Sequence, residues 1–167
     1  MAIVNTPAYQ ALIHSPIGDL GVHLQDDHLK SIDFLENHGR TEYGVKSWIA
    51  QLLKEYFHHP KTRLDCPLID PATLFQQRFR QALLLIPVGH VVTYGELAKQ
   101  IQTSPRALAQ ACRANPIPLV VPCHRVVAHD GLGGFSGSRQ GWPLTVKRWL
   151  LSHEGVEGYR EDAALKQ

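Results

Sequence analysis

Two closely spaced helix starts in the second half of the chain place the strongest limit on its fold. Thr93 and Glu96 have the spacing of a capping box, in which each side chain binds a backbone amide at the other's position. Ser104 and Pro105 form a second start, with a serine N-cap and a proline in the first turn. Only a brief turn at 102–103 separates the two short helices. This arrangement predicts a helix-turn-helix, although a helical hairpin inside a core has the same pattern.

The second of these helices is expected to end near residue 114, and the side chains on its surface are unusually small. Alanines recur along it, and small side chains such as Ala107 permit close approach to a broad surface. Arg106 and Arg113 supply positive charge on the same helix. The alternative is that alanine is present simply because it favours helix.

Charge is distributed unevenly along a chain whose net charge is only +2. Residues 1–72 carry six Lys and Arg against nine Asp and Glu, whereas residues 73–153 carry nine against two, a net +7. A basic block in a near-neutral chain indicates one face that meets an anion, and nucleic acid is the partner this favours. Ordinary solvated surface charge remains the alternative.

A thiol with two polar neighbours lies in the segment Pro-Cys-His-Arg-Val at 122–126. The apolar run at 117–121 predicts a buried strand that ends at the proline and presents Cys123. Positive charge from His124 or Arg125 would lower the pKa of the thiol, which suits a nucleophile. A buried core cysteine fits the same residues. Successive strand residues point to opposite faces, so Cys123 and His124 cooperate only if the chain turns there or a water connects them.

The remaining patterns predict an α+β fold in two parts. The sequence predicts three strands and a helix, then two prolines as a linker, then a helix that opens the second part, a glycine-rich loop and a closing helix. Their ranges are 9–14, 20–24 and 29–34 for the strands, 43–57, 74–85 and 144–153 for the helices, 67–71 for the linker and 132–137 for the loop. We therefore expect an N-terminal α+β domain over 1–72 and a C-terminal winged helix-turn-helix-like domain over 73–167.

Cysteine usage and hydropathy exclude several classes of protein. Three cysteines, an odd count without paired spacing, argue against a disulfide framework and favour a reducing compartment. No Cys and His cluster has zinc spacing, and no apolar run approaches the roughly 18 residues of a membrane span. We expect no metal, no cofactor and no membrane partner, and a cytoplasmic location, or a nuclear one in a eukaryote.

Taken together, the motifs of the second half resemble one family, the O6-alkylguanine-DNA alkyltransferases, which are suicide repair proteins. The resemblance covers residues 73–155 strongly, and the first half only in length and α+β character. It is carried by Phe75-Gln76, Ile86-Pro87-Val88-Gly89, Thr-Tyr-Gly-Glu-Leu-Ala at 93–98, Asn115-Pro116, Pro-Cys-His-Arg-Val at 122–126, Gly-Phe-Ser-Gly at 134–137 and Leu-Leu-Ser-His-Glu-Gly at 150–155.

The resemblance implies a single-turnover reaction on double-stranded DNA containing O6-alkylguanine, by a protein that we expect to be a monomer. Cys123 would accept the alkyl group, and His124 would act as its base through a bridging water. Glu154 would orient that histidine, and Asn115 would order the active-site loop. Tyr94 would meet the flipped nucleotide and assist proton transfer to guanine.

The resemblance also implies contacts to the duplex and to the extruded base. Arg106 would fill the place vacated by the flipped nucleotide. The candidate DNA contacts are Arg106, Arg113, Arg125, Ala107 and Ser104, and the candidate base contacts are Tyr94, Phe135, Ser136, Gly137 and Val126.

The chain departs from the family pattern at several positions. The stretch between Tyr94 and Arg106 is about two residues short, which leaves open whether Arg106 or another arginine fills the gap. Ala109 and Phe135 stand where glycine and tyrosine are common. Residues 138–143 contain an insertion that places Glu154 farther along the chain from Cys123.

Three other classes of protein are compatible with single motifs. A module that recognises the alkylated base without repairing it would lack the cysteine, which Cys123 argues against. A helix-turn-helix regulator would need only the two helices. A cysteine hydrolase would need an oxyanion hole, for which the sequence offers no signal.

Overall fold

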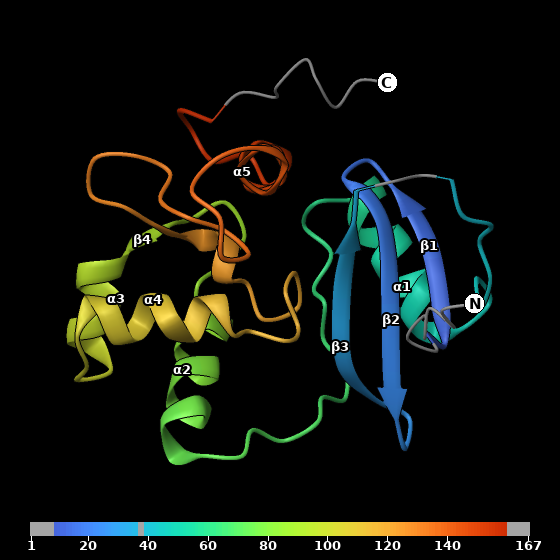
Figure 1. Ribbon diagram of the computed structural model, residues 1–167, viewed down its shortest axis with the longest axis horizontal. Coiled ribbons are helices and arrows are strands. Elements are labelled where there is room, and N and C mark those ends of the chain that lie inside the picture. The colour runs from blue at the N-terminus through green and yellow to red at the C-terminus, as the bar shows by residue number, and fades with distance from the viewer. Residues whose placement is uncertain (1–8, 37–38, 160–167) are drawn as a thin grey trace, which may run out of the picture.

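The computed structural model describes residues 9–36 and 39–159 (Figure 1). Its N-terminal part is a three-stranded antiparallel sheet in the order β1 (Ala11–Ser15), β2 (Gly18–Gln25) and β3 (His28–Leu35). β1 pairs with β2 across a tight turn that joins Ser15 to Gly18, and β2 pairs with β3 with a register shift at His23 and Leu24. The three expected strands are confirmed: β1 starts and ends slightly later than the pattern predicted, and β2 and β3 are two or three residues longer.

Helix α1 (Trp48–His58) covers one face of this sheet. Its first turn is capped by the Ser47 hydroxyl, which accepts from the Ala50 amide. The apolar stripe predicted from the spacing is buried, with Ile49, Leu53 and Tyr56 almost fully inaccessible. The helix starts about five residues later than expected, because the chain before it forms a separate bridge between Leu12 and residue 43.

The second part begins with α2 (Leu74–Leu84), which the sequence placed correctly. The apolar spacing of this helix predicts Phe75, Phe79, Leu83 and Leu84 on its buried side. Phe79 and Leu83 are buried, whereas Phe75 and Leu84 remain 36% and 48% exposed. The helices α3 (Tyr94–Gln100) and α4 (Pro105–Arg113) follow and pack against each other.

Both predicted caps of this helix pair are present. The capping box at the start of α3 is complete, with both hydrogen bonds formed between Thr93 and Glu96. The Ser104 hydroxyl caps α4 by accepting from the Ala107 amide at 3.0 Å. The short connection contains Gln102 in the left-handed region, at φ 58°. The helix-turn-helix prediction therefore corresponds to two contacting, separately capped helices on one side of the molecule (Figure 1).

The expected strand over 117–121 is wrong. This segment is a buried turn, with Leu119 in the left-handed region at φ 73° and the Val121 amide bonded to the Ile117 carbonyl. The chain then enters a short 3₁₀-helix, η1 (Cys123–Arg125). Prolines at positions 116, 118 and 122 lack amide donors, so the run cannot form a strand ladder despite its apolar character.

The second part closes on a two-stranded parallel sheet and a long helix. β4 (Val92–Thr93) pairs with β5 (Val126–Val127), and α5 (Trp142–His153) lies between the N-terminal sheet and the α2–α4 group in Figure 1. One continuous apolar core includes residues from both parts of the chain. No helix among residues 9–36 and 39–159 is long and apolar enough to cross a membrane.

Candidate active site and DNA-binding surface

Cys123 is the first residue of η1 and is 6% exposed. Burial raises the pKa of its thiol, while a hydrogen bond from Asn115 and the charge of Lys147 act in the opposite direction. The expectation that His124 and Arg125 lower the thiol pKa is wrong. Both side chains are engaged with a carboxylate, and the cation that faces the sulfur comes from α5.

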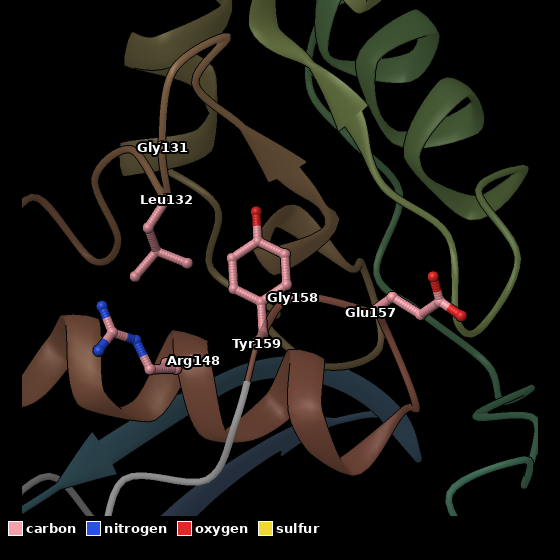
Figure 2. A pocket seen from close by; sticks show the side chains of 6 residues that line it. All are labelled: Gly131, Leu132, Arg148, Glu157, Gly158 and Tyr159. Atoms are coloured by element: carbon pink, nitrogen blue, oxygen red, sulfur yellow. The ribbon is translucent and has the colours of Figure 1, made fainter.

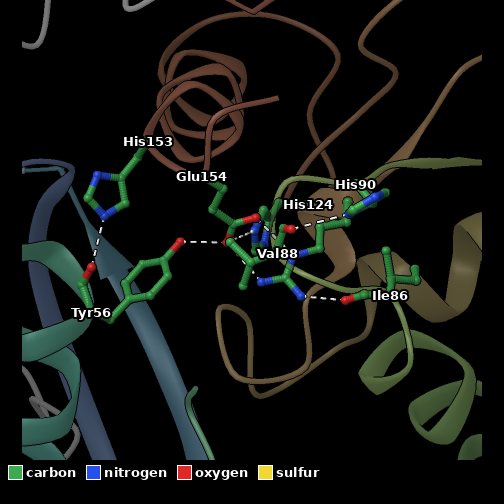
Figure 3. A network of polar contacts seen from close by, with 8 residues as sticks. Tyr56, Ile86, Val88, His90, His124, His153 and Glu154 are labelled. Atoms are coloured by element: carbon green, nitrogen blue, oxygen red, sulfur yellow. Dashed lines mark hydrogen bonds and ion pairs between the residues drawn. The ribbon is translucent and has the colours of Figure 1, made fainter. Parts of the chain in front are cut away.

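His124, Arg125 and Glu154 form one buried network (Figure 3). His124 Nε2 lies 2.8 Å from Glu154 Oε1, and Arg125 donates to both carboxylate oxygens at 2.9 and 3.0 Å. Burial alone would raise the pKa of Glu154, but the charges and hydrogen bonds of His124 and Arg125 hold it well below its ordinary value. Glu154 is therefore ionised, so Nε2 of His124 carries a proton.

The other imidazole nitrogen of His124 is available. Nδ1 is buried and has no hydrogen-bond partner among the described residues. Because the chain turns into η1 directly after Pro122, Cys123 and His124 do not alternate across a strand. This removes the geometric objection raised by their adjacency in sequence and leaves Nδ1 as the nitrogen that can accept a proton.

Arg125 does not belong to a DNA-binding surface, and that expectation is wrong. Its side chain is buried, with Nη1 bonded to the Ile86 carbonyl at 2.6 Å in addition to the two contacts with Glu154. A guanidinium fixed on a carboxylate in this way cannot reach a phosphate.

Lys147 is a site residue that sequence reasoning missed. Its side chain is fully buried, and Nζ donates to the carbonyls of Val126 at 2.7 Å and Gly134 at 2.9 Å. Burial lowers the pKa of Lys147 to about 8, while Cys123 and Cys112 pull it upward. A recognisable signal exists, because Lys147 is followed by core leucines three and four residues later and so lies on the apolar side of α5.

Tyr94, at the start of α3, lies beside this lysine. Lys147 Nζ is 5.7 Å from the centre of the Tyr94 ring, and the phenol donates a long hydrogen bond of 3.4 Å to the Gly134 carbonyl. Burial raises the pKa of Tyr94, so its hydroxyl is protonated and can donate. Gly133, at φ 74°, packs against the ring so closely that a Cβ there would lie 2.9 Å from it.

Asn115 organises the turn that leads to the cysteine. Its Nδ2 donates to the Val121 carbonyl at 2.9 Å, and its Oδ1 accepts from the Ile117 amide at 3.1 Å. The two bonds hold the ends of the turn together and keep its last residue next to η1. The next residue, Pro116, accepts a hydrogen bond from Ile32 of β3, which ties this turn to the N-terminal sheet.

The candidate base contacts divide into exposed and buried groups. Ser136 and Gly137 are exposed at the tip of the glycine-rich loop, both with positive φ. Phe135 and Val126 are buried, Phe135 with its ring 5.8 Å from that of Phe34 in β3. Their contact with an alkylated base stays a prediction, as it does for Tyr94.

The outer face of α4 carries the remaining candidate DNA contacts. Ser104, Arg106 and Arg113 are exposed and Ala107 is half-buried. The Ser104 hydroxyl is already used in the helix cap. Arg113 lies against the glycine-rich loop at 132–137, which we call the substrate loop for its predicted base contacts, because a Cβ on Gly137 would lie 3.1 Å from the Nε of Arg113. The C-terminal end of α4 and this loop are therefore neighbours on the surface.

Two hollows on the surface lie away from the thiol. One is lined by Leu132, Arg148 and Tyr159 and holds no nucleophile (Figure 2). The other runs behind the buried network and is lined by Tyr56, Leu85 and Arg125, among others. Within the described part of the chain, no group of three or more His, Cys, Asp or Glu is placed to hold a metal ion.

The paired helices and the sequence that follows them match a known class of domain. Residues 74–156 match the family model described as the 6-O-methylguanine DNA methyltransferase, DNA binding domain. A methylated-DNA–protein-cysteine methyltransferase of Thermococcus kodakarensis is 54% identical over 69 residues, which span 41% of this chain and 37% of that relative.

Two further relatives match over most of the chain. A methylated-DNA–protein-cysteine methyltransferase of Metallosphaera sedula is 34% identical over 144 residues, 84% of this chain and 89% of the relative. The crystal structure of Mycobacterium tuberculosis O6-methylguanine methyltransferase superposes with a TM-score of 0.72 at 37% identity, covering 86% of this chain and 90% of that one. The chain belongs to the methylated-DNA–protein-cysteine methyltransferase family.

Proposed function

We propose that this protein repairs O6-alkylguanine in double-stranded DNA by moving the alkyl group irreversibly to its own Cys123. The observation that carries the proposal is the cysteine beside a buried His124–Glu154 pair with Nδ1 of the histidine unengaged. A solved relative from M. tuberculosis is in complex with DNA, which supports DNA as the partner.

The chemistry needs a thiolate, an accessible alkyl carbon and a proton for the leaving guanine. The Cys123 proton passes to Nδ1 of His124, and Glu154 stabilises the resulting imidazolium. The sulfur then attacks the alkyl carbon in line, so that the S–C bond forms as the C–O6 bond breaks. The electron pair goes to guanine, which takes a proton from the Tyr94 hydroxyl, and the Lys147 ammonium beside that ring returns a proton to the tyrosine. The product is a thioether, which water does not cleave, so each molecule acts once.

Lys147 and Asn115 assist ionisation of the thiol. Burial opposes the thiolate, and both side chains favour it. A base in a duplex cannot reach a buried sulfur unless it leaves the stack, so the mechanism requires base flipping. We assign the face of α4, with Arg106 and Arg113, to the duplex and the exposed loop at 136–137 to the extruded base.

We also propose a role for each part of the chain, a monomeric active form and a reducing compartment. Residues 73–167 supply the nucleophile and the DNA-binding surface, while residues 1–72 pack against this part of the chain through the shared apolar core. One chain supplies every side chain of the network, which supports a monomer as the active form. Free thiols at Cys66, Cys112 and Cys123 suit a reducing cytosol or nucleus.

One experiment separates this function from its rivals. The protein is incubated with an oligonucleotide that contains O6-methylguanine, and the intact chain and its Cys123 peptide are weighed. We expect the mass of one methyl group to be gained once, on Cys123. A DNA-binding regulator or a recognition module would gain nothing, and a hydrolase would turn over without retained mass.

The Cys123→Ala variant tests the acceptor directly. It should lose all transfer but keep affinity for the alkylated duplex, because the thiol contributes little contact area. Cys112→Ala is the matched control, since its thiol is also near the site and burial raises its pKa to about 12. Methyl uptake at Cys66 or Cys112 in Cys123→Ala would show that the assignment is wrong.

A further inference from the structure

Among residues 9–36 and 39–72, one side chain bonds directly to the network formed by His124, Arg125 and Glu154. Tyr56, on the buried face of α1, places its hydroxyl 2.7 Å from Oε1 of Glu154 (Figure 3). The two residues are 98 positions apart, and both are buried. The phenol donates to the same carboxylate oxygen that accepts from His124.

Tyr56 is itself fixed to the end of α5 by its backbone. His153 Nε2 lies 2.8 Å from the Tyr56 carbonyl, and the two rings meet edge to face with centres 5.3 Å apart. The imidazole of His153 also stacks on Trp149 at 4.6 Å. The carbonyl of Tyr56 therefore binds His153, the last residue of α5, and its hydroxyl binds Glu154, the C-cap residue that follows, which fixes where the Glu154 carboxylate lies.

The protonation states favour one direction of donation. Burial first, and then the negative charge of Glu154, hold the pKa of Tyr56 far above its ordinary value, so the phenol is always a donor. Among the described residues, the titratable or charged groups that face this carboxylate are Tyr56 from α1 and His124 and Arg125 from η1. Each hydrogen bond that Tyr56 or Arg125 donates to the Glu154 carboxylate reduces the negative charge that remains to stabilise the imidazolium form of His124.

We propose that Tyr56 is a positioning residue for alkyl transfer, which holds the Glu154 carboxylate in register with His124 and limits how strongly it stabilises the imidazolium. The proposal rests on the alkyl-acceptor function of Cys123. It gives the N-terminal part of the chain a specific role in the reaction, in addition to its packing.

The test uses Tyr56→Phe, which removes the hydroxyl and keeps the ring. Tyr9→Phe is the matched control, because the Tyr9 hydroxyl also donates to a carboxylate, Asp33, at 2.9 Å in the N-terminal sheet. Rates of transfer from free O6-benzylguanine to Cys123 are measured against pH in the full-length chain. We expect Tyr56→Phe to be roughly 10- to 150-fold slower, as for loss of one hydrogen bond to a charged group, and Tyr9→Phe to be unchanged.

The pH profile distinguishes positioning from simple structural support. Without the phenol, Glu154 stabilises the imidazolium more strongly, so the acidic limb should move to higher pH. A loss of folded protein would lower the amplitude without moving this limb. A Tyr56→Phe profile that superposes on that of the wild type in rate and position would overturn the proposal.

A second variant covers the case in which Tyr56→Phe does not fold. 3-Fluorotyrosine introduced at position 56 keeps the hydroxyl and makes it a stronger donor, so the acidic limb should move to lower pH. An unmoved limb would again contradict the proposal. Wild-type protein that gains no methyl mass would instead refute the function of Cys123, so the two failures are distinguishable.

Discussion

At the scale of single residues, the reactivity of Cys123 depends on a balance between burial and two neighbours. Burial excludes the water that would solvate a thiolate, which raises the thiol pKa. The Lys147 ammonium offsets part of this cost, and it is held by two carbonyls in a fixed position rather than on a flexible surface. The charge that activates the sulfur therefore comes from α5 and not from the residues next to it in sequence.

Lys147→Gln should slow alkyl transfer by roughly 10- to 150-fold, the range expected for loss of a buried charge-assisted contact worth about 1.5–3 kcal/mol. Glutamine has no charge and reaches one bond less far, but it keeps two N–H donors beside the Val126 and Gly134 carbonyls, so the variant removes the cation and retains a polar group there. The pKa of Lys147 is about 8, so in the wild type this assistance fades as pH rises through that value. The variant should lack this dependence when its rate is followed with free O6-benzylguanine.

Arg148→Gln is the control for that prediction. It removes a charge of the same sign one residue further along α5, on the exposed side of the helix. Its rate with the free base should equal that of the wild type. Equal slowing of both variants would mean that general electrostatics, and not a cation facing Cys123, governs the rate.

Glu154→Gln should destabilise the fold by about 3 kcal/mol near neutral pH, because it leaves Arg125 buried without its carboxylate. The pKa of Glu154 is held below its ordinary value of 4.5, so its stabilising contribution is complete above that pH and declines as pH falls below it. The difference in free energy of unfolding between wild type and variant should therefore shrink in acid. Urea unfolding at several pH values measures this difference in free energy of unfolding. The control is Glu157→Gln at an exposed position, whose free energy of unfolding should equal that of the wild type at each pH.

At the scale of elements, local signals predicted the helices and failed at the turn before the cysteine. The caps at Thr93 and Ser104 act within three residues, so the sequence alone located α3 and α4. The apolar run at 117–121 also has the composition of a strand, but its prolines and the two hydrogen bonds of Asn115 impose a turn. The segment is apolar because it is buried. Its backbone is a turn because of the prolines and the hydrogen bonds of the Asn115 side chain.

Part of the site could be predicted in the same way and part could not. Cys123, His124 and Tyr94 were found because each lies in a short motif. The bond between Tyr56 and Glu154 joins residues 98 positions apart, and its sequence signal is only a tyrosine on an apolar helix face. Arg125 was assigned to DNA because a charge pattern does not reveal that a carboxylate from α5 meets it.

Arg106→Ala should slow repair of duplex DNA by roughly 5- to 30-fold while leaving the reaction with free O6-benzylguanine almost unchanged. A free base needs no extrusion, so a side chain that supports the flipped state, worth about 1–2 kcal/mol, matters only in the duplex. Arg106 is exposed on α4, and the arginine that lies beside Gly137 of the substrate loop is Arg113. Single-turnover rates with both substrates measure the difference.

Arg113→Ala serves as the comparison within the same helix. Because Arg113 packs against Gly137, its loss should disturb the substrate loop and slow both reactions to a similar extent. If Arg106→Ala slows both substrates equally and Arg113→Ala slows only the duplex, the flipping role belongs to Arg113.

At the scale of the whole molecule, charge and support are divided between the two parts of the chain. The N-terminal part is acidic and is attached to the site at three points, namely Tyr56 on Glu154, Ile32 on Pro116 and Phe34 on Phe135. The second part is basic and presents its cations beside the loop and α4. A duplex approaching this molecule is therefore attracted to the second part and repelled by the first.

The structure limits how steeply DNA binding can depend on salt. Of the nine cations in residues 73–153, Arg125 and Lys147 are buried, and Arg80 is half-buried on the Ile69 carbonyl. The six exposed ones are Arg78, Lys99, Arg106, Arg113, Arg139 and Arg148. Each phosphate contact contributes about −0.9 to the slope of log K against log salt, so these six cations together account for a slope no steeper than about −5.

Two variants make this slope a test of the surface. Arg106→Ala should reduce its magnitude by up to about 1, because α4 loses a cation that would lie between the two phosphate backbones of the duplex, while Lys46→Ala in the acidic part should leave it unchanged. Fluorescence anisotropy of a labelled duplex across a salt series measures both, with Cys123→Ala as the background to prevent reaction. A dissociation constant that does not change with salt, or a slope altered equally by Lys46→Ala, would contradict the assignment of DNA to the face formed by α4 and the substrate loop.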